Sequence, residues 1–169
     1  KGVLQKADTL NQNGRIYPRP ILEREVRNYQ KLINENRALG ECDHPDTSVV
    51  ELKNASHVMR SVYIEEDTVF GELELLNTPS GKILQSLVES GITLGISSRG
   101  VGSTKEVNGN DVVQDDFCLV AFDAVSEPST CNAYLFKESR NILESDLRKQ
   151  FKKSDRVNRL YNDILDWRK

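Results

Sequence analysis

Two neighbouring serines lie in a glycine-flanked segment, Gly95-Ile96-Ser97-Ser98-Arg99-Gly100. Glycines let the backbone bend and approach a ligand closely, which a buried strand by itself does not require. A serine at the end of such a strand, with free backbone N–H groups beside it, has what acyl transfer needs: a hydroxyl that attacks and donors that bind the oxyanion. The alternative interpretation of this segment is a polar bend in the wall of a barrel.

The chain has only two histidines, so candidates for a general base at neutral pH are few. His44 lies in Gly40-Glu41-Cys42-Asp43-His44-Pro45, where the glycine and the proline predict a rigid corner between a strand and a loop. His57 lies inside a strand pattern and is interpreted as structural. We therefore favour His44 as the base, against the alternative of an ordinary histidine in a surface loop.

An acid on an apolar strand face is the third signal. Asp123 alternates in phase with the apolar residues Leu119, Ala121 and Val125. A carboxylate in such a place is costly unless it has a partner. Asp123 would complete a Ser-His-Asp set if it orients a histidine, whereas a structural ion pair explains it equally well.

Two other kinds of site use the same residues. Cys42, His44 and a nearby acid have a spacing that zinc could accept, but structural zinc needs four ligands in paired motifs and no second pair exists. Cys42 could instead be a thiol nucleophile, although a side chain two residues from His44 on a strand would point the same way without facing it. No phosphate loop or dinucleotide fingerprint occurs, so we expect neither a metal nor a cofactor.

These residues must be positioned by a mixture of helices and strands. Pro20 opens a helix whose apolar positions recur at spacings of three and four as far as Ile33. A second helix follows Thr78-Pro79 and ends at Gly91. Strand patterns cover 58–64, 69–75, 94–101 and 112–125, and amphipathic helical patterns follow from about Ser139. The sequence thus predicts an α+β domain on an antiparallel sheet or barrel, followed by a charged helical tail.

Composition limits the class of protein. With 169 residues, 37% of them hydrophobic and 29% charged, the chain suits one soluble globular domain. No apolar run approaches the roughly 20 residues of a membrane span, and no signal-peptide pattern opens the sequence. Three cysteines, an odd and sparse set, suit free thiols in a reducing compartment.

The net charge of −3 hides an asymmetry. Residues 137–169 carry a net charge of +4, so residues 1–136 carry −7. An acidic body argues against nucleic acid as the main partner, and the basic tail is interpreted as a solvated helix face.

Four segments together resemble the prohead core protein proteases of contractile-tailed bacteriophages, which are similar to the herpesvirus assemblins. The segments are 11–26 (NQNGRIYPRPILEREV), 38–46 (ALGECDHPD), 95–103 (GISSRGVGS) and 120–129 (VAFDAVSEPS). Each motif is short, but their order and spacing make the combination specific. The resemblance covers most of residues 10–130 and does not extend to the tail.

The resemblance implies a closed or nearly closed antiparallel β-barrel flanked by helices. Together with the helical pattern that follows, it divides the chain into an expected protease domain over residues 1–138 and a tail over 139–169. It implies a serine endopeptidase that acts inside the procapsid, in the host cytoplasm, on scaffold and capsid proteins. No membrane or specific nucleic acid is expected as a partner, and self-association into a homo-oligomer is left open. A structural protein of the capsid or tail-tube type without catalysis, and a zinc hydrolase, are the alternatives.

The same resemblance assigns roles to residues. His44 falls in the Gly-Glu-x-x-His-Pro context of the family histidine, and Ser97 is preferred to Ser98 because the family serine lies in a Gly-aliphatic-Ser run. Asp123 fits the third member of the set, which would fix the histidine tautomer. We place the oxyanion hole at backbone N–H groups of Ser98–Gly100. Arg99 either adds charge there or pairs with an acid.

The family also cleaves after Glu in a Leu/Ile-x-Glu pattern and cuts itself. Among the triplets of this kind, Ile142-Leu143-Glu144 lies where the barrel-like pattern gives way to the basic tail. We therefore expect self-cleavage between Glu144 and Ser145.

Overall fold

This computed structural model describes residues 1–45 and 47–136, which form strands and two α-helices. The elements are β1 (Gly2–Lys6), β2 (Arg15–Ile16), α1 (Arg19–Asn34), β3 (Leu39–Glu41), η1 (Leu52–Asn54), β4 (Ala55–Glu65), β5 (Thr68–Leu75), α2 (Pro79–Glu89), β6 (Gly95–Val101), β7 (Thr104–Val107), β8 (Asn110–Val113) and β9 (Cys118–Val125). The tail over 139–169 and the expected cleavage at Glu144-Ser145 lie outside the described residues.

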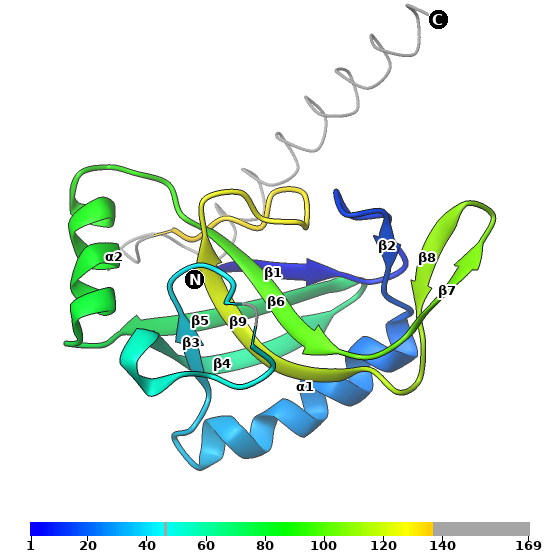
Figure 1. Cartoon of the computed structure of the whole chain (residues 1–169), viewed down its shortest axis with the longest axis horizontal. Helices are drawn as coiled ribbons and strands as arrows, with labels where there is room; N and C mark the ends of the chain where they lie inside the picture. The colour runs from blue at the N-terminus through cyan, green and yellow to red at the C-terminus, as the bar shows by residue number, and fades with distance from the viewer. Residues whose placement is uncertain (46, 137–169) are drawn as a thin grey trace, which may run out of the picture. The chain divides into compact units, whose positions relative to one another are not determined.

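The strands form a curled, mostly antiparallel half-barrel. Four strands pair in the order β1-β5-β4-β3, and the long curved pair β6–β9 crosses in front of them (Figure 1). The hairpin β7–β8 and the short strand β2 form a third sheet. A parallel bridge between Cys42 and Ala124 joins the end of β3 to β9.

The described strands do not form the closed or nearly closed antiparallel barrel that was expected. Within the described part of the chain, the strand ladders fall into three separate sheets, and β2 pairs with β8 in parallel. The half-barrel curvature agrees with the expected barrel-like core. A continuous ladder depends on the pairing of strand edges distant in sequence, on which strand patterns carry no information.

The two helices begin and end as the sequence predicts. Pro20 lies in the first turn of α1, where its missing N–H costs nothing. The Thr78 hydroxyl accepts a hydrogen bond from the Gly81 N–H at 3.1 Å and caps α2, and Gly91 follows the helix with a φ of 79°. Helix α1 packs on β4 and β9, and α2 packs on β4 and β5.

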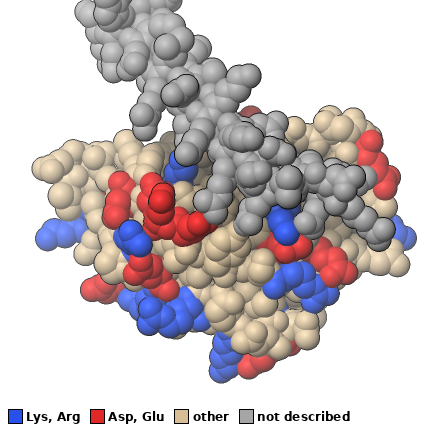
Figure 2. Space-filling view, turned by 180° about the vertical axis from the view of Figure 1, so that it is seen from behind, with Lys and Arg blue, Asp and Glu red and all other residues tan. Residues whose placement is uncertain are grey.

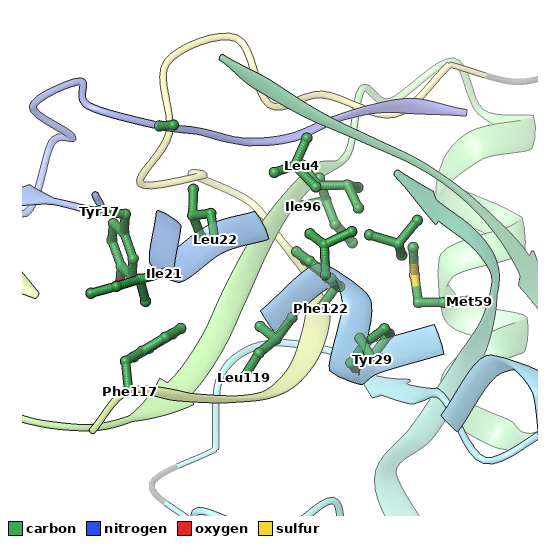
Figure 3. Close-up of a cluster of buried hydrophobic side chains, with 14 of the residues drawn as sticks. Leu4, Tyr17, Ile21, Leu22, Tyr29, Met59, Ile96, Phe117, Leu119 and Phe122 are labelled. Atoms are coloured by element: carbon green, nitrogen blue, oxygen red, sulfur yellow. The ribbon is translucent and has the colours of Figure 1, made fainter. Parts of the chain in front are cut away.

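The main core lies between α1 and the sheets (Figure 3). Phe122 of β9 is 1% exposed and meets Tyr29 of α1 edge to face, with the ring centroids 5.5 Å apart. Such an aromatic pair contributes roughly 1 kcal/mol beyond the area that it buries. Because side chains alternate along a strand, the burial of Phe122 turns its neighbour Asp123 to the other face of β9.

Strand β9 contains a bulge that alters the expected alternation. Arg99 pairs with Ala121 and Gly100 pairs with Leu119, so Val120 is the extra residue. Leu119 consequently packs in the main core with Phe122. The expectation that Leu119 shares a face with Asp123 is therefore wrong, whereas the expected burial of Asp123 is confirmed at 0% exposure.

On the visible face of the molecule, charged residues of both signs are mixed (Figure 2). In Figure 2, acidic and basic side chains lie side by side in small groups, and uncharged surface lies between these groups. Among the described residues, no helix has both the length and the apolar character needed to cross a membrane.

Gly40 offers a test of this packing. A Cβ there would lie 2.2 Å from His57 Nε2 and 2.2 Å from the Phe122 carbonyl oxygen. We expect Gly40→Ala to lower the free energy of unfolding by about 3 kcal/mol, because an overpacked core must shift its backbone. Gly91→Ala is the control, since a Cβ there meets nothing and only its positive φ costs about 1 kcal/mol. Equal losses in urea denaturation would contradict this account.

Candidate active site

The β6–β9 ladder brings the predicted site residues to one place. Ser97 pairs directly with Asp123 across the two strands, and Ser98 pairs with Phe122. Residues directly opposite each other in an antiparallel pair share a face, so Ser97 lies on the Asp123 face and Ser98 on the Phe122 face. Arg99, two residues beyond Ser97, returns to the face of Asp123.

Asp123 is surrounded by donors. Its Oδ2 lies 2.8 Å from His44 Nδ1 and accepts a hydrogen bond from Arg99 Nε at 2.7 Å. Its Oδ1 accepts the Glu41 backbone N–H at 3.0 Å. Burial by itself would raise the pKa of Asp123, but the hydrogen bonds from His44 and Arg99 outweigh it and lower this pKa below its ordinary value. The carboxylate is therefore ionised at neutral pH.

His44 lies in the loop between β3 and β4, and its side chain is 38% exposed. The loop leaves β3 beside the acid, because the Asp43 N–H donates to the Ala124 carbonyl at 2.8 Å while Asp43 adopts a φ of 63°. With Nδ1 bound to Asp123, the other ring nitrogen of the imidazole, Nε2, is left to take up a proton. The structure thus places His44 beside Asp123, and the catalytic role of the two residues remains a prediction.

The two serines differ in environment. Ser97 is 4% exposed, and its Oγ lies 3.1 Å from the Oγ of Ser129, while Ser98 is half-buried. Within the described ranges, no hydrogen bond joins His44 to either serine. Hydrogen bonds of a catalytic set are often unformed without substrate, so this arrangement does not exclude Ser97. Ser129 lies beyond β9, and its contact with Ser97 was not predicted from the sequence.

Arg99 pairs with acids, the second of the two expected roles. Its guanidinium binds Asp123 and Glu41 and also donates from Nη1 to the Thr47 carbonyl at 2.7 Å. Glu41, Arg99 and Asp123, which we call the buried charge cluster, are 0%, 9% and 0% exposed. Glu41 was not among the predicted site residues, although its place three residues before His44 was a usable signal.

Gly100 has a packing reason to be glycine. A Cβ there would lie 2.4 Å from two ring carbons of Phe117 and 2.7 Å from the Cys118 carbonyl oxygen. This contact accounts for the glycine without an oxyanion hole. The assignment of backbone N–H groups at Ser98–Gly100 to the oxyanion remains a prediction.

His57 is structural, as the sequence analysis interpreted it. It is 0% exposed, with Nδ1 2.8 Å from Ser56 Oγ and Nε2 2.9 Å from the Phe122 carbonyl oxygen. Burial lowers its pKa, because a charged imidazolium is costly away from water. Its hydrogen bond to the Phe122 carbonyl helps to hold the backbone next to Asp123 in place.

The rival sites find little support in the geometry. Burial, and then the charge of Asp43, raise the pKa of the Cys42 thiol, so less of the reactive thiolate forms at neutral pH. Cys42 also packs against the small apolar cluster of Leu84, Leu94 and Ala124. Over residues 1–45 and 47–136, no group of three or more His, Cys, Asp or Glu side chains is arranged to hold a metal ion.

A histidine bound through Nδ1 to a buried carboxylate, on a strand paired with one that carries two serines, is an arrangement typical of serine hydrolases. Residues 1–147 match the family model described as "Prohead core protein serine protease". The chain belongs to this family of serine proteases.

Two comparisons extend this result. The chain is similar to the prohead core protein protease of Enterobacteria phage T4, with 33% identity over 143 residues that cover 80% of this chain and 66% of that relative. The chain thus spans about two thirds of the length of this relative. Its structure is similar to that of the bacteriophage T4 capsid assembly protease, gp21, with a TM-score of 0.71 and 29% identity over 75% of this chain and 80% of the other.

The lowered pKa of His57 predicts a pH effect on stability. Below about pH 6.5 the unfolded chain binds a proton at this residue that the folded chain does not, so the contribution of His57 to stability falls as the pH falls. We expect His57→Gln to be less stable than the wild type at pH 7 but to lose less further stability between about pH 7 and pH 5. Urea denaturation across this range measures both quantities. Parallel curves for the two proteins would contradict the prediction.

Proposed function

We propose that this chain is a serine endopeptidase whose site is formed by His44, Asp123 and a serine of the Ser97-Ser98 pair, with Ser97 preferred. The observation that carries the proposal is the Nδ1 contact of His44 with the buried, ionised Asp123. It leaves Nε2 as the proton acceptor. Ser97 is preferred because it lies opposite Asp123 in the ladder.

The reaction follows the two steps of acyl transfer. His44 Nε2 accepts the proton of the serine hydroxyl as its Oγ attacks the scissile carbonyl, and the proton then passes to the leaving amine. A water molecule attacks the acyl-enzyme with the same histidine as the base. Asp123 fixes the tautomer and stabilises the imidazolium. For Ser97 to act, its Oγ must exchange its contact with Ser129 for one with His44.

The substrates that we propose are the scaffold and capsid proteins of a phage procapsid, cleaved inside that particle after Glu in a Leu/Ile-x-Glu pattern. The support is membership of the prohead core protein serine protease family and the names given to the phage T4 relative and to the phage T4 structure. The proposed domain limits are residues 1–138 for the protease and 139–169 for the tail.

Substitution of each serine tests the site. We expect Ser97→Ala to lose cleavage of a procapsid scaffold protein by as much as about 10⁶-fold, because it removes the nucleophile. Ser98→Ala is the matched control and should retain at least partial activity. Gel analysis of the digested scaffold, with circular dichroism of each variant to confirm folding, gives the result. If Ser98→Ala is inactive and Ser97→Ala active, the nucleophile is Ser98; activity in both variants would reject the serine site.

Self-cleavage between Glu144 and Ser145 is the second expected activity. Other triplets of the pattern lie in folded elements: Leu22 is buried on α1, and 87–89 belongs to α2. Proteases require an extended, accessible segment, so these are poor substrates. Mass spectrometry after long incubation should detect a cut after Glu144 in the wild type and none in Ser97→Ala. An intact chain in a preparation that digests scaffold protein would contradict the expectation.

A further inference from the structure

Glu41 is a buried carboxylate that the proposed mechanism does not use. It ends strand β3, three residues before His44, and is 0% exposed. Its Oε2 accepts a hydrogen bond from Arg99, and its Oε1 accepts the backbone N–H of Glu51 at 3.1 Å. One carboxylate thus joins the Arg99 side chain on β6 to the far end of the loop that carries His44.

Arg99 provides a second connection to the same loop. Its Nε donates to Asp123 at 2.7 Å, and its Nη1 donates to the Thr47 carbonyl at 2.7 Å. The third nitrogen, Nη2, binds Glu41 and lies 3.3 Å from Asp123 Oδ1. Every nitrogen of the guanidinium is therefore engaged, and the fork geometry of the group fixes their directions.

The loop has little else to hold it in place. Its described residues from Asp43 to Val49 are mostly exposed, and Val49 is 70% exposed, so apolar packing contributes little. Besides the His44–Asp123 contact itself, three polar contacts of its described residues tie the loop to the rest of the protein: the Asp43 N–H at its start, the Thr47 carbonyl in its middle and the Glu51 N–H at its end. Two of these three contacts are made by the buried charge cluster.

We propose that Glu41 is a positioning residue, which acts through Arg99 and the Glu51 N–H to hold the His44 loop against Asp123. The inference rests on the proposed function, because it assumes that His44 and Asp123 carry out the reaction. It extends that function to a residue that does not touch the substrate. A glutamate is required, since both of its oxygens accept from N–H donors, whereas glutamine would present its own N–H₂ to one of these donors.

Glu25 supplies a matched control. It is also a buried glutamate, 4% exposed, which accepts a β9 backbone N–H, that of Leu119, at 2.8 Å and an arginine N–H, that of Arg24, at 2.9 Å. Leu119 lies at the other end of β9 from Asp123. Glu25→Gln therefore makes the same chemical change as Glu41→Gln and should also lower stability. It does so away from the His44 loop.

The experiment compares the kinetics of both variants on a Leu/Ile-x-Glu peptide. We expect Glu41→Gln to lower kcat by about tenfold or more with KM within about twofold, since misplacing a catalytic group by about 1 Å can cost up to about 10²-fold. Glu25→Gln should keep kcat within about twofold of the wild type, because the loss of its hydrogen bonds affects stability only. Wild-type kcat in Glu41→Gln, or equal losses of kcat in both variants, would overturn the proposal.

Hydrogen exchange in the unaltered protein tests the same contacts without relying on activity or on a variant that folds. We expect the Glu51 N–H to be protected, because it is bonded to Glu41, while the N–H groups of the exposed Ser48 and Val49 exchange rapidly. Rapid exchange at Glu51 would overturn the proposal. If the wild-type chain cleaves no peptide, the proposed function fails, and the exchange result still decides whether Glu41 holds the loop.

Discussion

The carboxylate of Asp123 is fully buried on strand β9, and most of the candidate site is an arrangement that keeps this charge ionised. An unpaired carboxylate in such a place would take up a proton, because burial favours the neutral form. Arg99, His44 and the Glu41 backbone N–H together supply the donors that prevent this. Removal of one member of such a buried pair costs about 3–5 kcal/mol, so the same contacts serve both the fold and the chemistry.

Packing on the opposite face of β9 determines where that charge can lie. Phe122 is held in the core against Tyr29, and its carbonyl oxygen is bound by the buried His57. These contacts fix the strand in register and in rotation, and Asp123 then faces the loop of His44. Gly40 makes the arrangement possible, because any side chain there would occupy the space of His57 and of the Phe122 carbonyl.

The histidine and the acid are in contact in this structure, whereas the serine hydroxyl is not yet engaged with them. Ser97 Oγ contacts Ser129 Oγ, and its side chain is almost fully buried. The buried charge cluster is thus fully hydrogen-bonded, whereas this hydroxyl has, among the described residues, a single partner, another hydroxyl. The electrostatic environment of the candidate site is thus organised before any substrate binds.

The sequence by itself determined the two helices, most strand positions and the three residue types of the site. Proline, threonine and glycine set the helix ends locally, and a lone acid among apolar residues marked Asp123 because its burial is costly. Only the tertiary structure decided that the sheet is an open half-barrel, that Val120 is bulged and that Arg99 joins Glu41 to Asp123. These features depend on pairing between segments far apart in the chain. Hydrophobic periodicity specifies which face of a strand is buried, and it contains no information on which strand lies beside it.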